Sequence, residues 1–230
     1  ICDDGSIDNS KEVVDQINND LVKWIPLPHF GTPAIPRNNG IKISKGEWIA
    51  FCDSDDEWFP EKLEKQIKKA YETKCKAVCT NATRKVNGIN IIGNMINYKK
   101  EKIFFNDLLN SNSIVCSSSM IHKSVLERVG GFSETIEYGS YADFICWLRI
   151  ATQTNFAFIN EPLVIYDDHP ETSMRKEKIS DIELKENAFK NFKEWSIQIQ
   201  QNKKYILLFK INIIKQKIKM FFVEKIWKQK

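Results

Sequence analysis

A short apolar run that ends in a cluster of carboxylates is the feature that most constrains this chain. Residues 48–52 (WIAFC) have the composition of a buried strand, and residues 53–57 (DSDDE) follow directly. Open α/β sheets bind ligands at the carboxyl ends of their strands. Carboxylates this close repel one another, whereas a divalent cation accepts them as hard oxygen ligands. The cluster therefore predicts either a metal site or a solvated acidic turn before a helix that begins near Pro60.

Strand-like and helical segments alternate along most of the chain. The helix after Pro60 is expected to bury Leu63, Ile67, Ala70 and Tyr71, and residues 28–39, with a glycine and three prolines, are expected to form a loop. Asn87-Gly88 predicts a hairpin, and Gly130-Gly131 is expected to end the preceding helix. Such alternation indicates an α/β sandwich. The expected strands are 48–52, 77–79, 114–121, 156–159 and 163–166, and the expected helices are 9–19, 123–129 and one from residue 143.

The length and composition allow one α/β domain and an appendage. The chain has 230 residues, of which 42% are hydrophobic and 28% charged, as in ordinary globular proteins. After about residue 179 the pattern becomes purely helical. We therefore expect an α/β domain over residues 1–178 and a helical extension over residues 179–230.

The C-terminal segment is basic and amphipathic. Residues 203–230 contain nine lysines and one glutamate, which leaves the remainder of the chain mildly acidic. A mildly acidic body argues against a nucleic-acid-binding protein. An apolar stripe on a basic helix is suited to an anionic membrane surface, and a helix docked on the body or on a partner subunit is the alternative. The predicted stripe comprises Leu207, Ile211, Ile214, Ile218 and Phe221.

No signal peptide is visible in the sequence. The apolar runs near the C-terminus are too short to span a bilayer. These features predict a cytoplasmic protein, peripheral to the inner face of the plasma membrane if the basic helix binds lipid.

Several short motifs occur together in a characteristic order. Residues 3–8 (DDGSID) resemble the Val-Asp-Asp-Gly-Ser-Thr-Asp element of the inverting GT-A glycosyltransferases of family 2, and residues 36–41 (PRNNGI) resemble its Ala-Arg-Asn-x-Gly element. Residues 46–56 resemble the segment that carries the DxD motif. Residues 130–132 (GGF) and 143–149 (DFICWLR) are similar to two later elements. The resemblance spans residues 1–173 and implies a GT-A fold, a mixed sheet flanked by helices.

The resemblance also implies roles for individual residues. A divalent metal, Mn²⁺ or Mg²⁺, would be bound by Asp55, with Asp53 close to the metal or the ribose, and would neutralise charge on the leaving diphosphate. Asp3 and Asp4 would accept hydrogen bonds from the nucleotide base, although for these residues in isolation a plain Asp-Gly-Ser turn is the favoured explanation. Arg37 and the DxD turn, including Ser54, would contact the donor.

Asp143 is the predicted general base. Inversion by direct displacement requires a carboxylate opposite the leaving group to take the proton of the acceptor hydroxyl. The alternative is a helix N-terminal Asp that serves the helix dipole alone. Three departures from the family pattern stand out: the opening strand is missing, Ala142 replaces an acidic residue, and the residues after Tyr166 lack an Arg. His169 there is interpreted as a turn residue that could also contact metal or diphosphate.

The predicted activity is metal-dependent, inverting transfer of a sugar from a nucleotide donor to a hydroxyl group. The resemblance suggests a role in bacterial surface polysaccharide or lipid-linked glycan assembly. Two other classes stay open from the residues: a nucleotidyltransferase on a related fold, and a non-catalytic sugar-binding module.

Overall fold

The computed structural model describes residues 1–91, 93–135, 141–168, 180–200 and 203–227. His169 therefore lies outside the described residues. The elements are, in order, β1 (Cys2–Asp3), α1 (Ser10–Asp15), β2 (Ile25–Pro26), α2 (Ala34–Ile43), β3 (Trp48–Ala50), β4 (Glu57–Trp58), α3 (Lys62–Thr73), β5 (Ala77–Val86), β6 (Ile89–Ile91), β7 (Lys102–Ile103), α4 (Phe105–Asn110), the 3-10 helix η1 (Cys116–Ser118), β8 (Ser119–His122), α5 (Lys123–Val129), α6 (Ala142–Ala151), β9 (Phe156–Asp168), α7 (Asp181–Gln198) and α8 (Lys203–Trp227).

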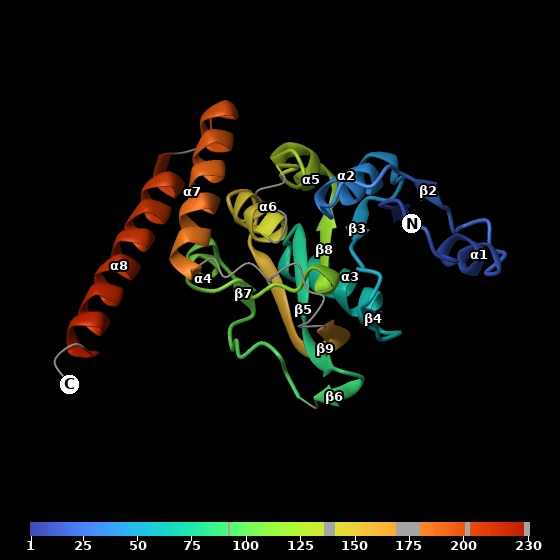
Figure 1. Cartoon of the computed structure of the whole chain (residues 1–230), viewed down its shortest axis with the longest axis horizontal. Coiled ribbons are helices and arrows are strands. Elements are labelled where there is room, and N and C mark those ends of the chain that lie inside the picture. Colours follow the sequence, from blue (N-terminus) through green and yellow to red (C-terminus); the bar gives the residue numbers. More distant parts are fainter. Residues whose placement is uncertain (92, 136–140, 169–179, 201–202, 228–230) are drawn as a thin grey trace.

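A mixed sheet of seven strands forms the centre of the fold. Its main order is β3-β8-β5-β9-β4, with β6 paired to β5 and β7 to β9. β5 and β9 run parallel, whereas β8 is antiparallel to both β3 and β5. β1 and β2 form a separate parallel pair, which lies with α1 at the end of the molecule opposite to α7 and α8 (Figure 1).

Helices cover both faces of the sheet. Successive side chains in a strand point to opposite faces, so a single strand contributes to a core on each side. In β5, Ala77 and Cys79 belong to the large core, which also holds residues of α4, α5 and α6. Val78, between them, packs with Ala70 of α3 in a smaller core on the other face. The expected α/β sandwich, a mixed sheet flanked by helices, is therefore confirmed.

Two expectations about helices were wrong. α2 occupies residues 34–43, and its first six residues lie in the predicted loop. A helix can begin there because Pro36 falls in the first helical turn, where its missing N–H costs nothing. In α3, Ala70 is buried and Ile67 packs against the smaller core as expected, but Leu63 and Tyr71 are exposed. Lys62 and Gln66 are fully buried in their place. The hydrogen bonds of these two polar side chains, described below, explain their burial.

The hairpin and the helix stop were predicted correctly. Asn87 and Gly88 connect β5 to β6 with φ angles of 50° and 78°. α5 ends at Val129, and Gly130 follows in the left-handed region with φ of 76°.

α7 and α8 pack against the α/β body. Phe192 of α7 and Phe209 of α8 are fully buried and belong to the large core. The predicted stripe of α8 does not take part in this core. It is exposed: Leu207, Ile214 and Ile218 keep 58%, 46% and 51% of their surface. Within the described residues, none of the helices combines the length and apolarity needed to cross a bilayer.

Candidate active site

The acidic turn after β3 is fixed by its backbone. The N–H of Asp53 donates to Ser117 Oγ at 2.9 Å, and the N–H of Asp56 donates to the carbonyl of Asp53 at 3.1 Å. Ser54 and Asp55 are exposed at the tip of this turn. The turn therefore presents Asp55 to solvent beyond the carboxyl end of β3, with Asp53 half-buried beside it.

Arg37 of α2 contacts both this turn and the loop that follows α5. Its Nη2 donates to Asp53 Oδ1 at 2.6 Å, and its guanidinium carbon lies 5.4 Å from the centre of the Phe132 ring. Burial opposes the charge of Arg37, but the nearby acidic groups of Cys116, Asp53 and Asp143 raise the pKa of the guanidinium above its ordinary value. Arg37 therefore stays cationic and lies within electrostatic reach of both Asp53 and Asp143.

Asp143 lies in the first turn of α6. Its Oδ1 accepts the N–H of Phe144 at 2.6 Å, and its side chain is half-buried. A carboxylate is stabilised there by the helix dipole. The remainder of α6 is anchored in the core by fully buried side chains such as Trp147. The predicted base is therefore held at the start of a helix that is anchored in the core.

Asp3 and Asp4 form a second group beside α2. Both oxygens of Asp3 accept from the N–H of Ser6, at 3.1 and 3.2 Å. Asp4 accepts the N–H groups of Phe30 and Gly31 at 2.9 and 3.2 Å. These contacts brace the turns at 3–6 and 29–31, which is the turn role that the sequence left open.

The four carboxylates of the acidic cluster have different environments, so only some of them remain candidates for the predicted metal site. Asp56 is 9% exposed, its Oδ1 accepts the N–H of Asp167 at 3.0 Å, and burial raises its pKa to about 6. Glu57 belongs to β4 and lies 3.5 Å from Lys85 Nζ. The side chain of Asp56 is therefore committed to a hydrogen bond with β9, and Glu57 lies on the surface. The carboxylates of Asp53 and Asp55 remain at the open turn.

A buried polar platform supports the turn, and the sequence analysis missed it. Trp58 Nε1 donates to the carbonyl of Ser117 at 2.8 Å, and Lys62 Nζ lies 3.9 Å from the centre of the Trp58 ring. Lys62 also donates to Gln66 Oε1 at 2.9 Å, and Gln66 Nε2 donates to the carbonyl of Ser118 at 2.9 Å. The Lys-x-x-x-Gln spacing, i and i+4 on one helical face, is the signal that could have revealed it.

The residues present fit a cation that is shared with a phosphate ligand. In the part of the chain that the structure describes, no group of three or more His, Cys, Asp or Glu side chains is arranged to hold a metal ion. Magnesium-type sites commonly use one or two carboxylates and complete the shell with water and substrate phosphate oxygens. Asp53 and Asp55 could supply such a pair.

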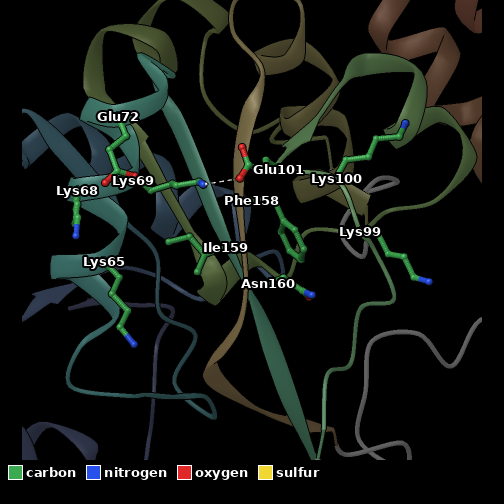
Figure 2. Close-up of a pocket in the computed structure, with 10 residues that line it drawn as sticks. All are labelled: Lys65, Lys68, Lys69, Glu72, Lys99, Lys100, Glu101, Phe158, Ile159 and Asn160. Atoms are coloured by element: carbon green, nitrogen blue, oxygen red, sulfur yellow. Dashed lines mark ion pairs between the residues drawn. The ribbon is translucent and has the colours of Figure 1, made fainter.

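A basic hollow of about 300 Å³ lies elsewhere, between α3 and the segment 99–101. None of the predicted site residues lines it. Lys69 reaches across to Glu101 at 3.7 Å, whereas Lys99 and Lys100 point away from the lysines of α3 (Figure 2). The divergent side chains do not converge on a ligand position, so the acidic turn is the better candidate site.

Comparison with known families now decides the class. The model of the family described as "Glycosyl transferase family 2" matches residues 1–130, more than half of the chain. The chain belongs to glycosyl transferase family 2. The match includes Asp3, Asp4, Arg37, Asp53 and Asp55 and ends before Asp143. This membership confirms the resemblance and favours a transferase over a nucleotidyltransferase.

Curated relatives of this family-2 chain are bacterial glycosyltransferases. WfgD of Escherichia coli, named UDP-Glc:alpha-D-GlcNAc-diphosphoundecaprenol beta-1,3-glucosyltransferase, is 26% identical over 86% of this chain and 72% of its own length. WfaP of Escherichia coli, named with the same activity, is 29% identical over 66% of this chain and 58% of its own length. The chain thus spans between half and three quarters of these relatives.

Solved structures show the same fold. A fragment of S. aureus TarS in complex with UDP-GlcNAc matches with a TM-score of 0.69 at 19% identity, over 89% of this chain and 58% of that one. The fragment in complex with UDP gives a TM-score of 0.66 at 18% identity, over 89% and 57%. The GT-A architecture is therefore shared, while the sequences have diverged widely.

Proposed function

We propose that this chain transfers a sugar from a nucleoside diphosphate to an acceptor hydroxyl, with inversion and with Mn²⁺ or Mg²⁺. One observation carries the proposal: Arg37 is ion-paired to Asp53 at 2.6 Å and lies within electrostatic reach of Asp143. This chemistry requires a donor-binding turn and a carboxylate base near each other, and the charge of Arg37 interacts with both Asp53 and Asp143.

The donor side is assigned to the turn after β3 and its neighbours. Asp55 and Asp53 would hold the cation, which neutralises charge on the departing diphosphate. Arg37 offers a fork of N–H donors suited to phosphate or ribose oxygens. Ser54 adds a hydroxyl at the exposed tip, and Asp3 and Asp4 are assigned to the nucleotide base.

Asp143 is assigned to the acceptor side. Its carboxylate would take the proton of the acceptor hydroxyl while that oxygen attacks carbon 1 of the sugar and the bond from carbon 1 to the diphosphate oxygen breaks. The configuration at carbon 1 inverts because attack and departure take place on opposite faces. The positive charge of Arg37 lies within electrostatic reach of this carboxylate.

The acceptor is proposed to be a lipid-linked glycan of a bacterial surface polysaccharide. Support comes from the relatives WfgD and WfaP, whose printed names specify a diphosphoundecaprenol acceptor and UDP-Glc. UDP and UDP-GlcNAc occur in complexes of the structural neighbour TarS. The donor sugar of this chain is left open, because it depends on loops that fold membership does not determine.

The exposed apolar face of α8, which does not pack on the core, is proposed to lie on the anionic inner face of the plasma membrane. The core-facing residues Phe209 and Ile213 are each two positions after exposed Leu207 and Ile211. Two residues correspond to about 200° around a helix, so the two apolar faces are opposite. The open face is flanked by exposed lysines, the composition of an interfacial helix.

Hydrolysis of nucleotide sugars tests the proposed activity. The chain is incubated with UDP-Glc and UDP-GlcNAc, with Mn²⁺ or with chelator, and free UDP is measured. Metal-dependent release is expected, and Asp55→Asn should lower it about 100-fold, because the turn loses a cation ligand. Asp15→Asn, a surface change beside Lys11 on α1, is the matched control and should leave it unchanged. Equal release with and without chelator would exclude the metal role.

A further inference from the structure

The C-terminal helix α7 is bonded to the loop that follows α5. Asn191 of α7 is 8% exposed, and its Nδ2 donates to Ser133 Oγ at 2.9 Å. Arg149 Nη2 of α6 donates to Asn191 Oδ1 at 2.6 Å. Trp195, one turn further along α7, donates through Nε1 to the carbonyl of Val129 at 2.9 Å. Both ends of the loop 129–133 are thus tied to α7.

The same loop is pressed against α2. The N–H of Phe132 donates to Asn38 Oδ1 at 2.9 Å, and Asn38 Nδ2 donates to the carbonyl of Phe132 at 3.0 Å. Gly131 has φ of +65°, and a Cβ atom there would lie 2.4 Å from Asn38 Oδ1. A glycine is therefore required at this contact. Any shift of the loop must move Asn38 or break its paired hydrogen bonds.

Arg37 is the neighbour of Asn38 on α2 and shares its contact with the loop. Its guanidinium lies over the Phe132 ring, at 5.4 Å from the centroid. The Nη2 atom of the same guanidinium pairs with Asp53. An unbroken series of contacts therefore runs from Asn191 through Ser133 and the loop to the donor side of the site.

We propose that Asn191 is a positioning residue: its bond to Ser133 fixes the loop 131–133 on Asn38 and so holds Arg37 against Asp53. The inference rests on the proposed function, because it assigns the contact to donor binding. Asn191 lies outside the matched residues 1–130. The C-terminal helix thereby completes a site whose other members lie in the α/β body.

Burial alone does not account for this arrangement. The Phe132 ring is already packed edge-on against Phe51 and Trp147, with centroids 5.2 and 5.8 Å away. An apolar residue at position 191 would satisfy the packing but leave Ser133 and Arg149 without this partner. Buried polar networks of this kind specify one geometry at a cost in desolvation.

Three variants separate positioning from stability. Asn191→Ala removes both bonds. Asn191→Asp restores them, since one carboxylate oxygen accepts from Arg149 and the other accepts from the Ser133 hydroxyl. Ser196→Ala, a fully buried position on the same helix, is the matched control. The probes are UDP with Mn²⁺, with Kd measured by calorimetry, and hydrogen exchange of the Phe132 amide.

We expect Asn191→Ala to raise the Kd for UDP about fivefold and to speed exchange at Phe132, a coupling of ordinary size for linked sites. Asn191→Asp should restore both values, and Ser196→Ala should change neither. A lower melting temperature with unchanged Kd and unchanged Phe132 exchange in Asn191→Ala would overturn the inference. If the parent chain binds no UDP, the proposed donor fails, and the exchange measurement alone decides the role of Asn191.

Discussion

Arg37 shows how a single side chain organises the site. Its side chain is 15% exposed, so its charge is compensated mainly by nearby carboxylates. Asp53 provides a direct ion pair, and Asp143 contributes from α6. A donor phosphate that enters beside Arg37 would compete with Asp53 for the guanidinium and release that carboxylate toward a cation.

Replacing Asp143 tests the base. Asp143→Asn retains the oxygen that accepts from Phe144 but cannot take a proton, so kcat for sugar transfer should fall about 100- to 10,000-fold with little change in donor Kd. Transfer to a defined acceptor and calorimetry with UDP measure the two quantities. Asp15→Asn makes the same chemical change on α1 and should behave as the parent. A variant that transfers sugar at near the parent rate would remove the assignment.

Lys62 provides a test of pH dependence. It is fully buried, and burial lowers its pKa from 10.5 to about 8. Between pH 8 and 10.5 the unfolded chain binds more protons than the folded one, so this residue's contribution to stability rises with pH. The shift corresponds to a cost of about 3 kcal/mol at pH 7.

Lys62→Met removes that cost and the bond to Gln66 together. We expect a net gain of about 1–2 kcal/mol in unfolding free energy at pH 7, which shrinks toward pH 10. Urea titrations at pH 7 and 9.5 measure it. Lys65→Met, on the outer face of α3 and paired with Glu161, should show no such pH dependence. A gain that is equal at both pH values would contradict the buried charge.

Among the elements, α8 has an unusual division of its surface. One face supplies Phe209 and Ile213 to the core, and the other leaves a row of large apolar side chains in solvent. Removing residues 203–230 would therefore disrupt the body as well as the open face. Substitutions confined to the exposed side chains are the appropriate test.

The triple variant Ile211→Asp, Ile214→Asp and Ile218→Asp should abolish co-sedimentation with vesicles that contain anionic phospholipid, because it removes apolar area and places negative charges on the face that would meet the anionic lipid. Ile197→Asp on α7, at a residue with 61% exposure, is the matched control. Neither chain should bind purely zwitterionic vesicles. The spacing of the stripe also suits a helical pair, so size-exclusion chromatography is run in parallel. A dimer that the triple variant dissociates, without vesicle binding, would assign the face to a second copy.

An element can be predicted from the sequence when its local residue pattern determines its structure, and it is missed when contacts with distant residues determine it. The stop of α5 at Gly130 and the hairpin at Asn87-Gly88 depend on φ angles that few residues adopt, so the sequence was sufficient. α2 and the buried face of α3 were mistaken. Prolines of a first turn resemble loop prolines, and the burial of Lys62 depends on partners in Trp58 and Gln66.

The candidate site divides in the same way. Asp53, Asp55, Arg37 and Asp143 could be proposed from the sequence because they lie in short motifs with a fixed order. The platform at Ser117 and the loop contact of Asn191 join segments far apart in the chain. Such pairs leave no local periodicity, and only the folded structure brings them together.

For the molecule as a whole, binding of a ligand should raise the free energy of unfolding. A ligand that binds only the native state raises the unfolding free energy by RT ln(1 + [L]/Kd), about 2.7 kcal/mol at 100 times Kd. For a chain of 230 residues, that gain corresponds to about 5–10 °C in melting temperature. We expect UDP with Mn²⁺ to produce this shift and UDP with chelator a smaller one. Because the α7 and α8 side chains share the large core with α6, the transition should stay single and move as one. A shift equal in Mn²⁺ and chelator would show that the nucleotide binds without the cation, and two separate transitions would show that the helical extension unfolds independently of the site.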